Sequence, residues 1–187
     1  LDTNFIVDDL FNFKPSDKFD LVMSIGVLMC TNDCLEAIRS LIRNTLKPGG
    51  SLYIGLYHKY GRPPFLNHFK KLSDEGSSEN ELLEEYSQIH SEIKDKTHIK
   101  SWFRDQVLHP HETLHTIEEM IPLLDAEGLK MTHTSVNRFE PINFKNDNYD
   151  EDQLRNIFDL EKKMENDSKK ALDDRRYYPG FFTFLAK

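Results

Sequence analysis

The sequence has 187 residues and a mass of 22.0 kDa, which is enough for one domain with a substantial hydrophobic core. Its 24 Lys and Arg against 32 Asp and Glu give a formal net charge of −8, which argues against nucleic-acid or membrane-surface partners because both are themselves negative. Hydrophobic residues make up 38% of the chain, with 13 Phe and 7 Tyr, and this content excludes a disordered protein.

The cysteine content and the length of the apolar runs bear on localisation. Cys30 and Cys34 are the only cysteines and fit no secreted disulfide framework, and no apolar run is long enough for a membrane helix. We therefore expect a cytoplasmic protein in which both cysteines act as small hydrophobic side chains.

Two apolar runs near the start predict strands. Phe5–Leu10 is short and is followed by the turn-forming residues 14–17. Phe19–Gly26 is almost continuously apolar, which is typical of a strand buried on both faces of a parallel sheet. The first residue is Leu1 and not Met, so the sequence reads as though it begins partway through a domain.

A helix and a second strand follow. Apolar residues recur at helical spacing after Asp33, and Asp33 with Glu36 forms a predicted capping box. Residues 47–50, Lys-Pro-Gly-Gly, end this helix, and Ser51–Tyr57 is predicted to be a strand. Strand, helix and strand in this order predict a parallel βαβ crossover and an α/β fold class.

The second half contains two charged segments that we interpret as insertions. Residues 66–111 are rich in helix-forming residues with one apolar stripe and predict a helical cover. Residues 140–178 contain a predicted charged helix over 150–176.

Three further elements are predicted outside these insertions. A capping box at Thr116 and Glu119 begins a helix that reaches Ala126 and contains Pro122. Leu129–Phe139 and Phe181–Ala186 are predicted strands. No internal repeat is present.

Three stretches together resemble class I S-adenosylmethionine-dependent methyltransferases: Asp9-Leu10, residues 19–28 and residues 46–54. The resemblance implies that residues 19–26 and 51–57 are the fourth and fifth strands of a sheet with the order 3-2-1-4-5-7-6. Residues 129–139 and 181–186 would be the sixth and seventh strands. It therefore implies a single domain over 1–187 with a partial Rossmann-like fold, comprising strands three to seven with helical insertions. The stretches 55–62, 102–106 and 109–112 also resemble one branch of bacterial members.

Two parts of the family pattern have no counterpart in this sequence. The glycine-rich loop that lies against the cofactor is absent, and so is the acidic residue that holds the ribose. We therefore expect an N-terminally truncated chain with an incomplete cofactor site. Without the first two strands, the strand at 19–25 would be an exposed edge. We expect either that Phe5–Asp8 pairs with it or that two copies form a homodimer through it.

The resemblance implies S-adenosylmethionine as the cofactor. Asp9 and Leu10 would contact its adenine, and Ser24, Ile25 and Gly26 would lie beside it at the carboxyl end of a strand. Asp9 and Gly26 could instead be ordinary turn residues.

Methyl transfer requires alignment of the acceptor with the methyl group and sometimes a general base. Candidate bases are His58, His109, His111 and His115. Aromatic and charged residues near them could form the walls of a pocket for a small-molecule substrate: Tyr57, Tyr60, Trp102 and Arg104. Each of these residues could equally be a surface or packing residue.

A metal cluster is an alternative use of the histidine-rich stretch. His109, His111 and His115 could combine with Asp105 and Glu112, but the spacing matches no known zinc pattern and we predict no metal. Two functions remain open: methyl transfer to an unidentified small-molecule acceptor by the parent enzyme, or a non-catalytic, self-associating remnant of the fold.

Overall fold

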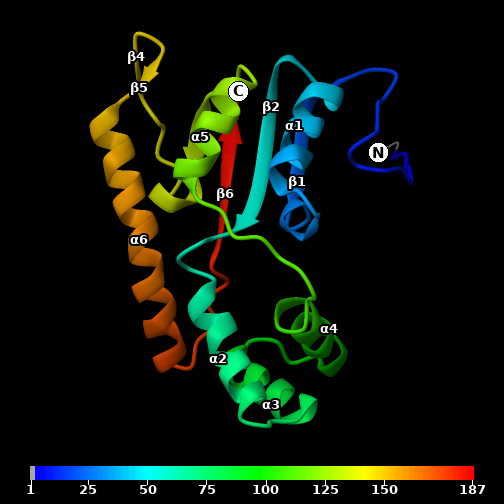
Figure 1. Ribbon diagram of the computed structural model, residues 1–187, viewed down its shortest axis with the longest axis vertical. Helices are drawn as coiled ribbons and strands as arrows, with labels where there is room; N and C mark the ends of the chain where they lie inside the picture. Colours follow the sequence, from blue (N-terminus) through cyan, green and yellow to red (C-terminus); the bar gives the residue numbers. More distant parts are fainter. Residues whose placement is uncertain (1–2) are drawn as a thin grey trace.

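The computed structural model describes residues 3–187. A four-stranded mixed sheet has the order β1-β2-β6-β3, and helices pack against it and extend beyond one end of it (Figure 1). The strands are β1 Phe19–Ile25, β2 Leu46–Tyr57, β3 Met131–Thr134 and β6 Phe181–Ala186, with a small hairpin of β4 Phe144–Lys145 and β5 Asn148–Tyr149. The helices are α1 Cys34–Thr45, α2 Pro63–Asp74, α3 Glu79–Ile89, α4 Lys96–Gln106, α5 Ile117–Ala126 and α6 Glu151–Asp173, with short 3₁₀ turns η1 Leu28–Cys30 and η2 Ser135–Asn137.

The crossover from β1 through α1 to β2 is confirmed. The Asp33 side chain caps α1 by accepting a hydrogen bond from the Glu36 backbone N–H at 2.9 Å. Gly49 has a φ of +74°, a backbone conformation that favours glycine, and the chain then pairs with β1 in parallel from Leu21 opposite Ser51 to Ile25 opposite Gly55.

Strand β6 lies between β2 and β3 and runs antiparallel to both. This order is the one that the resemblance implies for strands four, five, seven and six. Strand β3 is shorter than the predicted strand over 129–139, because η2 follows Thr134 directly and because Arg138 and Phe139 both have a φ of +61°. Left-handed backbone of this kind does not continue a strand.

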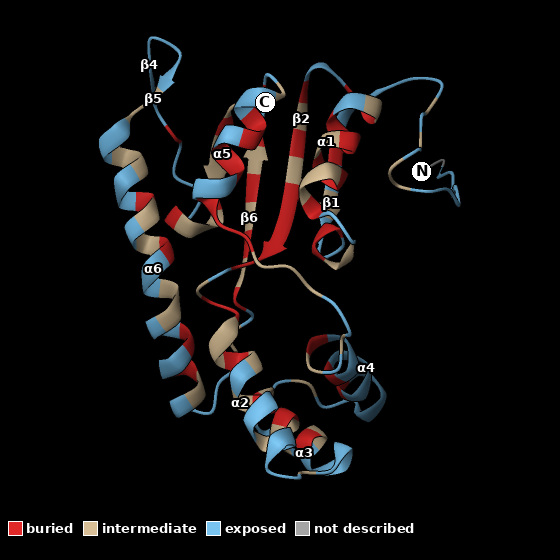
Figure 2. Ribbon diagram, viewed as in Figure 1, coloured by how far each residue is buried: buried red, intermediate tan, exposed pale blue. Residues whose placement is uncertain are grey.

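Helices α1 and α5 cover one face of the sheet (Figure 1). Side chains from alternate strand positions are buried beneath them and form the main core (Figure 2), including Val22, Leu52, Ile54, Phe182 and Phe184. Pro122 lies within α5, as the sequence predicted.

The other face of the sheet is open at β1. Leu21, Met23 and Ile25 point to it, and their exposed fractions are 52%, 57% and 50%. The prediction that this strand is buried on both faces is therefore wrong for this chain. The strand is apolar, as the sequence shows, but within residues 3–187 no element covers the face that carries Leu21, Met23 and Ile25.

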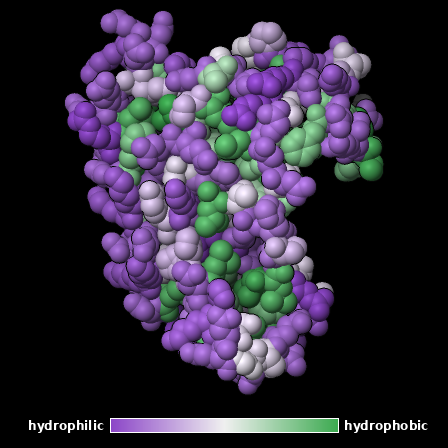
Figure 3. Space-filling model, in the orientation of Figure 1, coloured by the Kyte–Doolittle hydropathy of each residue, from purple (hydrophilic) through white to green (hydrophobic). Residues whose placement is uncertain are grey.

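The segment before β1 differs from the prediction. Residues 3–8 form no strand, and Phe5 and Val7 are 94% and 103% exposed; hydrophobic residues are visible at this edge of the molecule in Figure 3. Within the described residues β1 pairs with β2 alone. The predicted strand at Phe5–Leu10 and its pairing with β1 are therefore wrong, whereas pairing of two copies stays a prediction.

Helices α2, α3 and α4 form a second layer with its own hydrophobic cluster around Phe65, Tyr86 and Phe103. Helix α6 is 23 residues long and runs beside both the sheet and this helical layer (Figure 1). No helix within residues 3–187 is both long and apolar enough to cross a membrane.

Candidate functional site

A pocket of about 690 Å³ lies where the carboxyl ends of β1 and β2 meet the helical layer. Its sheet side is formed by Ile25, Gly26, Tyr57, Phe181 and Thr183, and its helical side by Trp102, Asp105, Gln106 and Tyr177. Four of the residues predicted for cofactor or substrate binding therefore come together here: Ile25, Gly26, Tyr57 and Trp102. Ligands of open α/β sheets bind at this end of the strands, and the volume is in the range of small-molecule sites.

The two walls are joined by the guanidinium group of Arg62, which is fully buried. Its Nε and Nη2 donate to the two carboxylate oxygens of Glu112 at 3.0 and 3.1 Å. Its Nη1 donates to the side-chain oxygen of Gln106 at 3.1 Å, and Nη2 also donates to the Gln106 carbonyl at 2.7 Å. Because Gln106 ends α4, this network fixes that helix relative to the sheet.

Two tyrosines connect this network to the pocket. The Arg62 guanidinium lies over the Tyr57 ring, 4.0 Å from its centroid. The Tyr177 hydroxyl donates to the Gln106 side-chain oxygen at 2.9 Å. Burial raises the pKa of both phenols above the ordinary tyrosine value, so both are neutral hydrogen-bonding groups at physiological pH.

His58 lies outside the pocket in a closed set of hydrogen bonds. Its Nε2 bonds to the Glu161 carboxylate at 2.8 Å, and its Nδ1 accepts from the backbone N–H groups of Tyr60 and Gly61 at 3.2 and 3.3 Å. Since Nδ1 is an acceptor, the proton sits on Nε2 and is donated to Glu161. Both side chains are buried, and the pair joins α6 to the end of β2.

The other candidate bases also lie away from the pocket. His109 is half-buried and His111 is exposed, and the His111 Nε2 is 3.2 Å from the Thr31 carbonyl. His115 is buried, with Nε2 bonded to the Thr113 hydroxyl at 2.8 Å and Nδ1 to the Glu119 carboxylate at 2.7 Å.

The remaining predicted site residues are dispersed. The Asp9 carboxylate accepts from the backbone of Phe11 and the side chain of Asn12 in a local turn that also contains Leu10. Ser24 points to the face covered by α1. Tyr60 is half-buried next to His58, and Arg104 pairs with Glu79 at 3.4 Å on the outside of the helical layer.

The alternative metal cluster is not assembled. In the part of the chain that the structure describes, no three His, Cys, Asp or Glu side chains are placed to hold a metal ion. Glu112 is engaged by Arg62 and His115 by Glu119. Cys34 is buried, which raises the pKa of its thiol to about 12, and Cys30 is partly buried.

Sequence reasoning missed several residues of the pocket. The sequence indicated Asp105 as a possible metal ligand, and it placed both Asp105 and Gln106 in the matching stretch 102–106, but neither was predicted as a pocket residue. Tyr177 and Pro179 lie in an aromatic segment with a Pro-Gly turn immediately before β6, and Phe181 is the first residue of that strand. A turn rich in aromatic residues at the end of a charged helix was the available signal.

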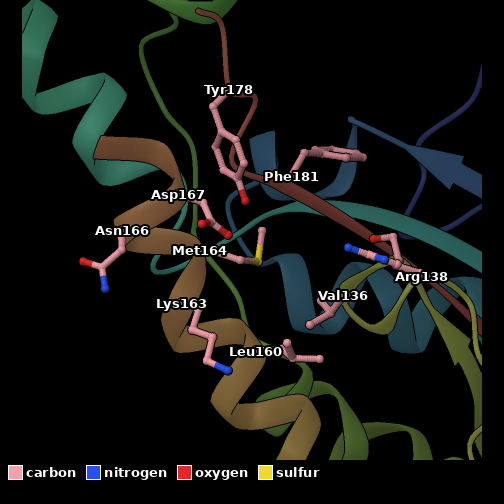
Figure 4. A pocket seen from close by; sticks show the side chains of 10 residues that line it. Val136, Arg138, Leu160, Lys163, Met164, Asn166, Asp167, Tyr178 and Phe181 are labelled. Carbon is pink, nitrogen blue, oxygen red and sulfur yellow. The ribbon is translucent and has the colours of Figure 1, made fainter. Parts of the chain in front are cut away.

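A second cavity of about 490 Å³ adjoins the first and shares Ser135 and Phe181 with it. The Arg138 guanidinium points into this cavity from one side, and the Asp167 carboxylate and Tyr178 hydroxyl point into it from the other (Figure 4). Burial raises the pKa of Tyr178 to about 12.

Comparison with known proteins gives a match at the level of structure alone. No family model and no curated protein sequence matches the chain. The fold is similar to that of PKMT2 from Rickettsia typhi, with a TM-score of 0.59 and 13% identity over 95% of this chain. PKMT2 in complex with AdoHcy gives a TM-score of 0.56 and 14% identity over the same share. The chain therefore has an α/β fold similar to that of PKMT2.

The match covers only part of the similar proteins. The chain spans 37% and 38% of the length of the two PKMT2 chains. A Haloferax volcanii complex between the Trm112 methyltransferase activator and a candidate methyltransferase aligns with 100% of this chain and 63% of its own, at 15% identity and a TM-score of 0.46.

Proposed function

We propose that this chain is the acceptor-binding part of an S-adenosylmethionine-dependent methyltransferase, and that the pocket between the sheet and α4 receives a small-molecule acceptor. The observation that carries the proposal is the position of the pocket. It opens at the carboxyl ends of β1 and β2, next to Ile25 and Gly26, in a fold similar to one that binds AdoHcy.

The residues present fit one side of a cofactor site. Gly26 has a φ of +73°, and no heavy atom lies within 4 Å of the position that its Cβ would take, so a ligand could approach the backbone closely there. Asp9 does not fit its implied role, because its carboxylate is used within its own turn. The described chain therefore supplies an incomplete cofactor site.

When bound, S-adenosylmethionine supplies an electrophilic methyl group. The residues of this chain would orient the acceptor and exclude water, through the rings of Tyr57, Trp102 and Phe181. Within residues 3–187, Asp105 is the pocket's only carboxylate, so it is our candidate to receive a proton from the acceptor. The earlier candidates His58, His109 and His111 lie elsewhere.

A second candidate function is self-association without catalysis, favoured by the unpaired edge of β1. In a two-fold antiparallel pair centred on Val22, Asp20 would face Ser24 and Leu21 would face Met23. Like charges would therefore not meet across the pair, and two copies could continue the sheet as a homodimer.

Calorimetric titration of the full chain with S-adenosylhomocysteine, alongside its mass by light scattering, tests both functions. Because the site is incomplete, we expect weak but saturable binding, and we expect Gly26→Ala to weaken it further by about tenfold, or about 1.4 kcal/mol. Gly76→Ala is the matched control, because Gly76 also has a positive φ and open space but lies outside the pocket. Absence of binding together with a dimeric mass would replace the first function with the second, and absence of binding by a monomer would contradict both.

A further inference from the structure

The pocket between the sheet and α4 combines aromatic rings with one carboxylate. Tyr57 and Phe181 contribute rings from the sheet side, and Trp102 and Tyr177 contribute rings from the helical side. Asp105 lies on α4 one turn after Trp102. From this combination we infer that the pocket binds a cation, and, resting on the proposed function, that the methyl acceptor is an amine.

The aromatic rings are suited to hold a cation. An alkylammonium or ammonium group is attracted to the negative face of an aromatic ring, and the attraction grows when water is excluded. Tyr57 and Phe181 meet edge to face, with centroids 5.7 Å apart at 82°, so the two rings present differently oriented surfaces at one wall. Trp102 is 40% exposed, which leaves part of its ring open to a ligand.

The charges around the pocket favour the same ligand. The positive charge of Arg62 is compensated by Glu112, which it contacts through two hydrogen bonds. Asp105 has no cationic partner within residues 3–187, and its Oδ2 accepts one hydrogen bond, from the Gln106 amide at 2.8 Å. The other side chains of the pocket are neutral. One negative charge therefore remains for a ligand to compensate.

Further charges line the adjoining cavity beyond Ser135 and Phe181. Arg138 and Asp167 point into that cavity (Figure 4), and Lys163 also lines it. None of these three side chains lines the pocket that contains Asp105.

Amine methylation in this pocket would form one bond to the methyl carbon and break another. The lone pair of the neutral amine nitrogen forms a bond to the methyl carbon, while the bond from that carbon to sulfur breaks and its electron pair stays on sulfur. The products are S-adenosylhomocysteine and an N-methylammonium ion, which then releases one proton to Asp105 or to water. Rings and carboxylate that hold an ammonium group also stabilise the positive charge that develops on nitrogen.

Trp102 allows a direct test because it is the only tryptophan in the sequence. The probes are choline and its uncharged isostere 3,3-dimethyl-1-butanol, titrated against the full chain while Trp102 fluorescence is recorded. We expect choline to bind at least about tenfold more tightly, corresponding to about 1.4 kcal/mol. Asp105→Asn should weaken choline binding and so reduce its preference over the isostere, because the carboxylate is lost while the rings remain. Asp159→Asn, on the exposed side of α6, should leave it unchanged.

Equal affinities for the two probes, an unchanged affinity in Asp105→Asn, or no binding of choline would each overturn the inference. Trp102→Phe keeps a ring and must remove the fluorescence signal, and calorimetry on that variant should still show choline binding. No cofactor is needed, so binding of S-adenosylhomocysteine without binding of choline would leave the proposed function intact and reject the amine.

Discussion

The ring of Phe181 lies against the backbone of Gly55, so closely that a Cβ at residue 55 would be 2.6 Å from the ring Cζ and 2.8 Å from Cε1. Ile25 closes the same position from the neighbouring strand, at 3.1 Å. Glycine at this position of β2 therefore leaves room for the Phe181 ring, which lines the pocket. The shape of the pocket therefore depends on the absence of a Cβ at residue 55.

Gly55→Ala should displace the Phe181 ring into the pocket. We expect a loss of about 1–3 kcal/mol in the free energy of unfolding from overpacking, together with a changed Trp102 emission, measured by urea unfolding followed by fluorescence. Phe181→Leu in the same chain removes the clashing ring atoms, so the double variant should lose less than the two single variants added together. Additive losses would contradict the contact.

Gly180→Ala should be much more harmful than a glycine substitution that causes backbone strain alone. A Cβ at residue 180 would lie 2.5 Å from the backbone N and Cα of Arg62, which cannot move without disturbing the buried guanidinium network. Gly128→Ala is the control, because Gly128 has a similar positive φ of +75° and open space. We expect about 1 kcal/mol for the control and a loss several times larger for Gly180→Ala, compared by thermal unfolding; equal losses would show that the backbone here adapts.

Glu161→Ala should destabilise the chain by about 3 kcal/mol, because it leaves the His58 Nε2–H and the Ile117 N–H buried without acceptors. Glu165→Ala on the same helix removes a half-exposed pair with Lys169 and should cost less than about 0.5 kcal/mol. Urea unfolding of both variants makes the comparison. A small effect of Glu161→Ala would mean that the pair does not join α6 to the sheet.

Stability should fall in weak acid because of His90. Burial lowers the pKa of His90 below its ordinary value of 6.5, and both ring nitrogens lack a hydrogen-bond partner within the described residues. As pH falls below about 6.5, the unfolded chain takes up this proton before the folded one. The free energy of unfolding of the natural chain should therefore fall relative to that of His90→Phe, which keeps the ring stacked on Tyr177. Parallel pH profiles between pH 5 and 8 would contradict this.

Local signals were sufficient for most of the fold. The caps at Asp33 and Thr116 predicted the starts of α1 and α5, the apolar run over residues 181–186 predicted β6, and the crossover followed from the order of elements. Burial at β1 could not be predicted in the same way. A nearly continuous apolar run shows that both faces suit apolar neighbours, whereas the presence of those neighbours depends on tertiary structure. The short run at Phe5–Leu10 is not a strand, and within residues 3–187 it pairs with no strand of the sheet.

The candidate site was predicted in part for a similar reason. The resemblance implied Ile25 and Gly26, which it placed at the carboxyl end of a strand, and Tyr57 was predicted as an aromatic wall of a substrate pocket. Histidines were weighted for their chemistry, but composition does not show whether an imidazole such as that of His58 faces a pocket or a buried carboxylate. Asp105 and Tyr177 are 72 residues apart and meet only through the packing of α4 against the segment before β6.

The chain contains two separate hydrophobic cores, one beneath the sheet and one within α2–α4, and the pocket lies on the boundary between them. Separate cores can open as separate cooperative units. The helical layer, held at this boundary by polar contacts such as those of Arg62 and Tyr177, could therefore open while the sheet remains folded. Hydrogen exchange would then be faster in α2–α4 than in β2 and β6. Ligand binding across the boundary would slow exchange in residues far from any contact, because it would join two units that otherwise open independently.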